Sequence, residues 1–308
     1  MPVRVKKSYR DGRPRLRWFL LFVAGVSLAF ALQLISLVRY AAGSELDSYI
    51  LLIPLISVYL AYLQGKKLMD GYGSSPGWGI ISAAVAVTVL AWHPSKHLSQ
   101  NDYLTLKMLA YVSFILCGGF LFMGREWMAR AAFPLGFLLF LIPLPNATVD
   151  KLETVSKLAS AETASFFFWL FDVPVLRDAQ DGTVFQLPNI ALRVAQECSG
   201  IHSSLILVIA SLIACHLLLN SFWRRAALIV FAIALGVVRN GFRIATLGWL
   251  CVHIGPEMID SPIHHRGGPI FFVLSLIPLF LLLWVLCKGD RKMIPANGSG
   301  LQRDPAIP

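Results

Sequence analysis

Long apolar blocks, separated by short polar and basic stretches, dominate the chain. Most blocks approach the ~20 residues that a helix needs to cross the hydrocarbon core of a bilayer, and the third and fifth are shorter. Eight such blocks predict eight membrane-spanning helices, at residues 18–38, 47–63, 78–92, 103–123, 131–144, 201–219, 226–254 and 268–287. The pattern therefore predicts an all-α polytopic membrane protein.

One polar segment, at residues 145–197, interrupts this series. Its first half, residues 146–171, places apolar residues at helical spacing opposite charged ones, which predicts an amphipathic helix that lies on the membrane or over the bundle. Its second half alternates apolar and polar residues at 183–187 and 190–194 on either side of Pro188-Asn189. This alternation around a turn predicts a small β-hairpin.

Composition excludes the soluble classes. Hydrophobic residues make up 56% of the 308 residues and charged residues 14%, whereas soluble domains carry roughly 45–50% and 25%. The net charge of +10 does not indicate a nucleic-acid partner, because the basic residues form short clusters between apolar blocks rather than one patch. We expect the lipid bilayer to be the surrounding partner.

Basic clusters also predict the orientation, since loops rich in Lys and Arg stay in the cytoplasm. They occupy the N-terminal stretch and alternate loops, at Lys66, Lys67, Arg125, Arg130, Arg224, Arg225, Lys288, Arg291 and Lys292. We expect a plasma (inner) membrane protein with a cytoplasmic basic stretch at 1–17, a membrane domain at 18–287 and a disordered cytoplasmic tail at 288–308. The first apolar block is long and lacks a small-residue cleavage site, so it predicts a retained anchor.

Charged residues inside a span are costly, at least ~2.5–3.5 kcal/mol each on insertion scales, and therefore indicate function. The seventh span contains Arg239 and Arg243, with Asn240 between them. The two arginines are four residues apart and share one helical face. Apolar residues continue on both sides of Arg243, which argues against snorkelling to the membrane surface.

On the predicted topology, a thiol and an imidazole lie toward the same outer membrane face as Arg243. Cys198 precedes the sixth span, and His264 and His265 precede the eighth. A thiolate is a strong nucleophile, an imidazole moves protons, and a guanidinium stabilises developing negative charge. Together they predict an acyl-transfer site. The remaining four cysteines lie in apolar blocks, no CxxC pair occurs, and we expect neither a metal nor a cofactor.

Three short motifs in this order resemble the exosortase/archaeosortase family of membrane cysteine transpeptidases, which act in sorting of the PEP-CTERM type. They are Glu-Cys-Ser-Gly-Ile at 197–201, Asn-Gly-Phe-Arg-Ile at 240–244, and His264 followed by Gly268 and a Phe pair at 271–272. The resemblance covers residues 131–287, and the earlier spans match only in hydropathy. The family motif commonly has Gly-Trp where this chain has Gly268-Pro269.

The resemblance implies a cysteine endopeptidase that works as a transpeptidase at the extracytoplasmic face. Cys198 would form an acyl-thioester, Arg243 would donate a proton or polarise the substrate, and His264 would stabilise the transition state. His265 remains an alternative to His264, and Arg239, Asn240, Glu197 and Ser199 are expected as supporting residues. The implied substrates are exported proteins whose C-terminal sorting signal comprises a recognition motif, a transmembrane helix and a basic cluster; the acyl acceptor is unknown.

Two other classes remain open. In a transporter or anion channel, Arg239 and Arg243 would bind an anion at mid-membrane and Cys198 would be incidental. In a structural assembly factor for polysaccharide or protein export, no single side chain would be indispensable. The need for the Cys198 thiol separates the enzyme from both alternatives.

Overall fold

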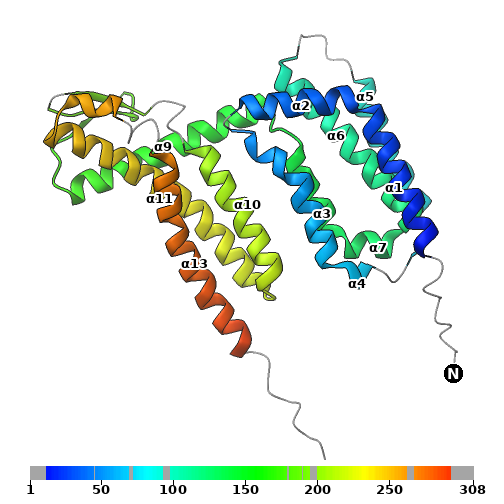
Figure 1. Cartoon of the computed structure of the whole chain (residues 1–308). Helices are drawn as coiled ribbons and strands as arrows, with labels where there is room; N and C mark the ends of the chain where they lie inside the picture. The colour runs from blue at the N-terminus through cyan, green and yellow to red at the C-terminus, as the bar shows by residue number, and fades with distance from the viewer. Residues whose placement is uncertain are drawn as a thin grey trace, which may run out of the picture. The chain divides into compact units, whose positions relative to one another are not determined.

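The computed structural model describes residues 12–44, 46–68, 72–92, 98–178, 180–188, 190–194, 200–261 and 267–292, and most of them are helical (Figure 1). Contacts along the chain divide it into two compact units, Met1–Asp150 and Lys151–Pro308. Each unit is described separately below.

Short helices surround one long buried helix in the first unit. The elements are α1 (Gly12–Ala29), α2 (Ala31–Gly43), η1 (Ser48–Leu52), α3 (Ile53–Leu63), α4 (Gly65–Leu68), α5 (Pro76–Ala91), α6 (Gln100–Gly118), η2 (Gly119–Met123), α7 (Arg125–Arg130), α8 (Ala132–Phe137) and η3 (Leu138–Leu141). The buried helix is α6, which packs against α1, α2 and α5. Its first turn is capped by the Ser99 hydroxyl, which accepts a hydrogen bond of 3.1 Å from the backbone N–H of Asp102.

The first predicted span is bent rather than straight. Helices α1 and α2 meet at an angle of 71°. The break falls at Phe30, whose backbone leaves the helical region (φ −98°, ψ 15°). The Phe30 ring packs against Tyr111 and Phe114 of α6, at 5.6 and 6.2 Å between centroids. Hydropathy alone shows a continuous apolar run and gives no sign of this aromatic contact.

The second unit combines long helices with a small sheet. Its elements are α9 (Asn146–Leu170, whose first turn belongs to the first unit), β1 (Leu176–Arg177), β2 (Val184–Gln186), β3 (Ala191–Arg193), α10 (Ile201–Leu218), α11 (Phe222–His253), η5 (Pro256–Asp260) and α13 (Gly268–Lys292). Both predicted features of the polar segment, the helix and the antiparallel hairpin, are confirmed.

The three strands form an antiparallel sheet in the order β1-β2-β3. Phe185 pairs with Leu192, and both side chains are buried, whereas Ala191 and Arg193 are exposed. The buried face packs against Phe168 of α9 and residues such as Ile244 of α11. One apolar cluster therefore fixes the hairpin to both helices.

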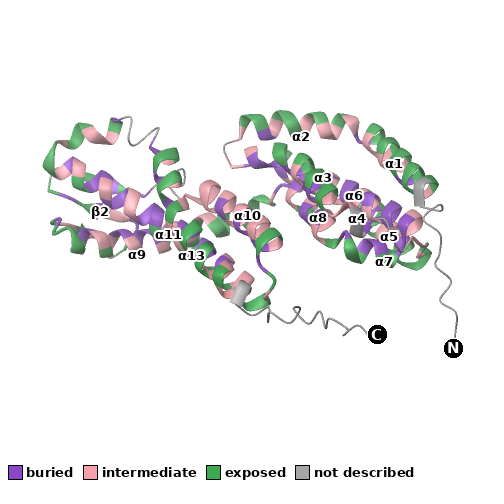
Figure 2. Cartoon of the chain, turned by 60° about the horizontal axis from the view of Figure 1, so that its bottom comes forward, coloured by how far each residue is buried: buried purple, intermediate pink, exposed green. Residues whose placement is uncertain are grey.

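Four helices are long and apolar enough to cross a membrane, or up to six if each bent pair forms one span; all lie in the part of the chain that the structure describes. Two further predicted spans coincide with the shorter apolar helices Ser48–Leu63 and Pro76–Ala91. Large apolar side chains such as Leu28 and Leu32 are exposed along α1 and α2 (Figure 2). Such surfaces suit lipid rather than water, and the polytopic membrane fold is confirmed.

Candidate active site

A polar segment, Arg239 to Arg243, interrupts a long apolar stretch near the middle of helix α11. Arg239 and Asn240 are buried, with 7% and 2% of their surfaces exposed, and Arg243 is half-buried. Burial of a guanidinium and an amide requires polar partners. The partners of Arg239 and Asn240 lie on the neighbouring helix α9 and at the start of α10.

Asn240 connects α11 to α9 and to the start of α10. Its Nδ2 donates a hydrogen bond of 3.0 Å to the Ser160 hydroxyl of α9. Its side chain also lies against Gly200, where an added Cβ would be only 2.7 Å from the Asn240 Cγ and Oδ1 atoms. Gly200 has a φ of +67°, a conformation that favours glycine. Both geometry and space therefore require glycine at this position.

Arg239 binds the backbone carbonyl of Gly200. Its Nη2 donates a hydrogen bond of 3.1 Å to the Gly200 carbonyl oxygen. The Ser204 hydroxyl donates to the same oxygen at 2.9 Å. The Nη1 atom of Arg239 is buried and has no hydrogen-bond partner among the described residues. One arm of the guanidinium thus positions the start of α10, and the other remains available as a donor.

Small residues bring the three helices together. A Cβ added at Gly241 would be 2.5 Å from the Thr163 Cβ of α9, and one added at Gly236 would be 2.5 Å from the Ser204 hydroxyl of α10. Small residues permit such close approach of helices within membranes. The polar side chains of α11 reach the backbone of α10 because of this packing.

Residues 195–199 are flanked on both sides by residues that pack on α11. Val194 is buried in the cluster that contains Ile244 and Ala245, and its N–H donates to the Thr183 carbonyl at 3.0 Å. Gly200, at the other end, lies against Asn240. The expected site residues Glu197, Cys198 and Ser199 lie outside the described residues.

The start of α13 reaches the same region of α11. The Phe271 ring packs edge-to-face on Phe242, with centroids 6.0 Å apart. Phe242 also packs on Phe167 of α9, at 5.3 Å. The expected residues His264 and His265 lie outside the described residues, just before this contact. Described parts of all three sequence motifs thus meet between Arg239 and Arg243.

An acidic residue at the base of the hairpin stabilises the turn that precedes β2. The Asp181 carboxylate accepts hydrogen bonds from the Thr183 hydroxyl (2.5 Å) and backbone N–H (3.1 Å), and it pairs with Arg193 at 3.2 Å. The Thr183 hydroxyl and then its N–H lower the pKa of Asp181 from its ordinary value, and Arg193 lowers it further. The ionised carboxylate therefore supports the hairpin at neutral pH.

A protein-family model described as transmembrane exosortase (Exosortase_EpsH) matches residues 38–281, which is most of the chain. The chain belongs to the transmembrane exosortase family. Neither curated proteins nor solved structures give a match. Family membership gives this exosortase a general role in membrane transpeptidation and protein sorting, and the matched region contains the entire polar segment of α11.

The candidate site includes partners that the sequence did not single out. Ser160 and Ser204 bond Asn240 and the Gly200 carbonyl, respectively. A signal for Ser160 existed, because Ala159, Ser160 and Ala161 form a run of small residues in an otherwise amphipathic helix, and such runs mark close helix contacts. Within the described ranges no group of three His, Cys, Asp or Glu residues could hold a metal ion.

Proposed function

We propose that this exosortase is a membrane-embedded cysteine transpeptidase that cleaves the C-terminal sorting signals of exported proteins through an acyl-thioester on Cys198. The observation that carries the proposal is the meeting of the described parts of the three motifs at residues 239–243 of α11. Gly200 contacts Asn240 and Arg239, and Phe271 contacts Phe242.

Chain connectivity supports a position of the thiol near Arg239 and Asn240. Only Ser199 separates Cys198 from Gly200, and consecutive α-carbons are ~3.8 Å apart, so the two α-carbons are at most about 7.6 Å apart. Gly200 is the residue that precedes the first turn of α10. The free N–H groups and dipole of a helix N-terminus favour a thiolate over a thiol.

The proposed reaction uses three groups. The Cys198 thiolate attacks the carbonyl carbon of the scissile peptide bond, and the carbonyl oxygen takes up negative charge in the tetrahedral intermediate. Arg243 polarises this oxygen or supplies the proton, and His264, or His265 in its place, stabilises the transition state. The C–N bond then breaks, the protonated amine leaves, and a nucleophile from the acceptor releases the acyl group.

Arg239 and Asn240 act as positioning residues in this scheme. They hold the Gly200 backbone through one hydrogen bond and one close contact, while Glu197 and Ser199 flank the nucleophile. The guanidinium of Arg239 suits this role, because its fixed fork of N–H donors holds the Gly200 carbonyl with one arm.

The proposal extends to location and partners. The basic loops favour a plasma (inner) membrane protein with both termini in the cytoplasm, so that Cys198 and the histidines face the extracytoplasmic side. Exported proteins with a recognition motif, a transmembrane helix and a basic cluster would be the substrates. Such signals keep the scissile bond close to the outer membrane face, which is where α10 begins in this orientation.

The decisive experiment is co-expression of the exosortase with an exported protein that carries such a sorting signal. Wild type should yield a shortened product, and mass spectrometry should detect the product's acyl group on Cys198. Cys198→Ala and Cys198→Ser should abolish both signals while the protein level in the membrane persists. No shortened product from wild type, together with anion transport that requires Arg243 but not Cys198, would instead support the transporter alternative.

A further inference from the structure

The first unit contains a pocket that the proposed reaction does not use. It has a volume of about 420 Å³ and lies between α5, α6, η2, α7, α8 and η3. Its wall includes Trp78, Leu116, Phe120, Met128, Leu135 and Leu139, and Arg125 is the one charged residue that lines it among those that the structure describes. A volume of this size lies within the ~300–1,000 Å³ that is usual for small-molecule sites.

The apolar wall disfavours water as the filler. A water molecule needs two to four polar partners, and apolar cavities remain dry. An empty pocket of this size would also forfeit dispersion contacts on every wall. Trp78 and Leu139 are about half exposed, at 50% and 55%, so the pocket opens to the surroundings of the unit. In a membrane those surroundings are lipid chains.

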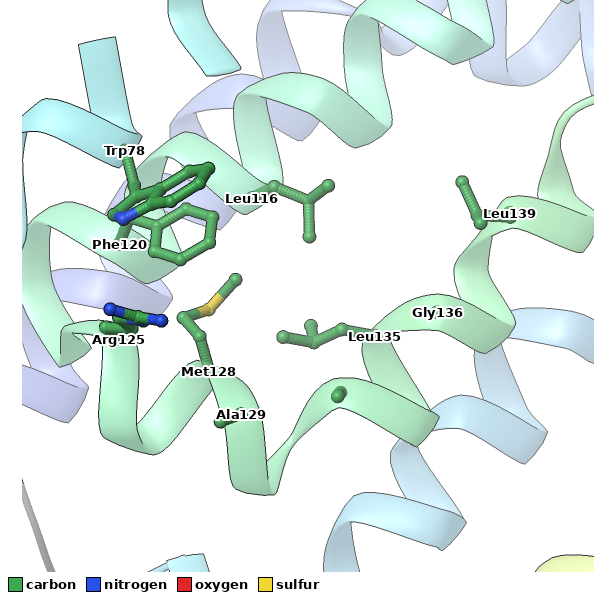
Figure 3. Close-up of a pocket in the computed structure, with 10 residues that line it drawn as sticks. Trp78, Leu116, Phe120, Arg125, Met128, Ala129, Leu135, Gly136 and Leu139 are labelled. Carbon is green, nitrogen blue, oxygen red and sulfur yellow. The ribbon is translucent and has the colours of Figure 1, made fainter. Parts of the chain in front are cut away.

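Arg125 gives the pocket a polar end. Figure 3 shows Arg125 beside Trp78, Phe120 and Met128, with Leu139 at the opposite end of the pocket. The Arg125 backbone N–H is held by the Ser75 hydroxyl at 3.0 Å, which fixes the base of the side chain. Its guanidinium forms no ion pair with any carboxylate in the described ranges. The pocket thus combines a long apolar wall with one available cation.

We propose that this pocket binds an anionic phospholipid, with an acyl chain along Leu116, Leu135 and Leu139 and the phosphate at Arg125. Such a lipid matches the pocket, because its acyl chain suits the apolar wall and its phosphate suits Arg125. On the predicted topology Arg125 lies at the cytoplasmic face, where basic pockets between membrane helices recognise anionic head groups. The lipid would bridge α5 and α6 to α7 and α8 and so stabilise the first unit.

The structure offers a clean way to fill the pocket. A Cβ added at Gly136 meets no atom within 4 Å, so Gly136→Leu places a side chain in the pocket without a clash at its first carbon. Leucine also favours the helix more than glycine does. Arg125→Gln removes the charge but keeps a polar, though shorter, side chain. Arg17→Gln is the matched control, because Arg17 is exposed and does not line the pocket.

Lipid retention by the purified full chain tests the proposal. Native mass spectrometry after incubation with phosphatidylglycerol or with phosphatidylcholine of the same acyl chains should show about fivefold greater retention of phosphatidylglycerol, the preference expected for one cation near a lipid phosphate. Arg125→Gln should reduce this preference to unity. Gly136→Leu should reduce retention of both lipids, and Arg17→Gln should change neither.

Equal retention of the two lipids by wild type would overturn the proposed head-group contact. Unchanged retention in Gly136→Leu, or an equal loss in Arg17→Gln, would overturn the location. If Gly136→Leu does not fold, Leu135→Trp fills the same space. Reduced retention of both lipids would then support the location, and unchanged retention would overturn it. The sorting reaction is not part of this readout, so the pocket and the proposed function succeed or fail independently.

Discussion

At the scale of single residues, Gly200 is the position of the candidate site where a larger side chain should do most harm, because it lies against Asn240. We expect Gly200→Ala to abolish processing of a sorting-signal substrate, because its Cβ would meet the Asn240 amide at 2.7 Å. The cost in stability should be about 1–3 kcal/mol, as for other overpacked sites. Processing assays and thermal unfolding in detergent measure the two effects.

The control for this variant is Gly25→Ala, since a Cβ at Gly25 meets nothing within 4 Å. It should leave both processing and unfolding temperature unchanged. Normal processing by Gly200→Ala would show that the start of α10 does not depend on Asn240. In that case the contact would not bear on the reaction.

The sequence indicated the polar residues of this site but not the way they connect. Arg239, Asn240 and Arg243 are conspicuous because they interrupt an apolar span, and the cost of burial singles them out. The run of small residues around Ser160 marks a close helix contact, but it does not say which side chain Ser160 bonds. Its bond to Asn240 depends on the approach of α9 to α11, and tertiary packing decides that distance.

At the scale of secondary-structure elements, the hairpin that precedes Cys198 depends on Asp181. The pKa of this carboxyl is lowered from its ordinary value of 3.8. Its contribution to stability is therefore fully present above pH ~3.8 and is lost only as the pH falls through the lower folded value. We expect Asp181→Asn to speed amide hydrogen exchange in residues 184–193 at pH 6, because the charged pairing with Arg193 is gone.

Exchange of wild type and Asp181→Asn is compared at each pH, so that intrinsic rates cancel. The difference should persist down to pH ~3.8 and vanish at lower pH, where the wild-type carboxyl becomes protonated. Asp172→Asn serves as the control, because Asp172 lies outside the strands and its carboxylate forms no ion pair with any described residue. Equal exchange in the wild type and Asp181→Asn at every pH would show that Asp181 does not stabilise the hairpin.

Elements with a clear period were predictable, and elements set by packing were not. The amphipathic helix and the hairpin appear in the alternation of apolar residues. Strand β1 has only two residues, Leu176 and Arg177, which is too short for any period. The bend at Phe30 was also missed, because it results from ring contacts with α6 and not from Gly or Pro.

At the scale of the whole molecule, hydropathy and basic loops were enough to predict a polytopic membrane protein. The division into two compact units at Asp150 and Lys151 was not visible, because α9 runs through that boundary as one continuous helix. A boundary inside a helix leaves no Gly, Pro or polar linker in the sequence. Contacts distant in the chain define it instead.

The orientation of the membrane domain can be tested through the cysteines. Cys117, Cys215 and Cys251 are buried, and Cys287 lies near the end of α13 beside the last turn of α10, which the basic loops assign to the cytoplasmic side. A membrane-impermeant maleimide applied to intact spheroplasts should therefore modify Cys198 alone. Labelling should disappear in Cys198→Ser and persist in Cys287→Ser. If modification required permeabilised membranes, the thiol would face the cytoplasm, where it could not reach a signal on an exported protein, and the transpeptidase mechanism would have to be abandoned.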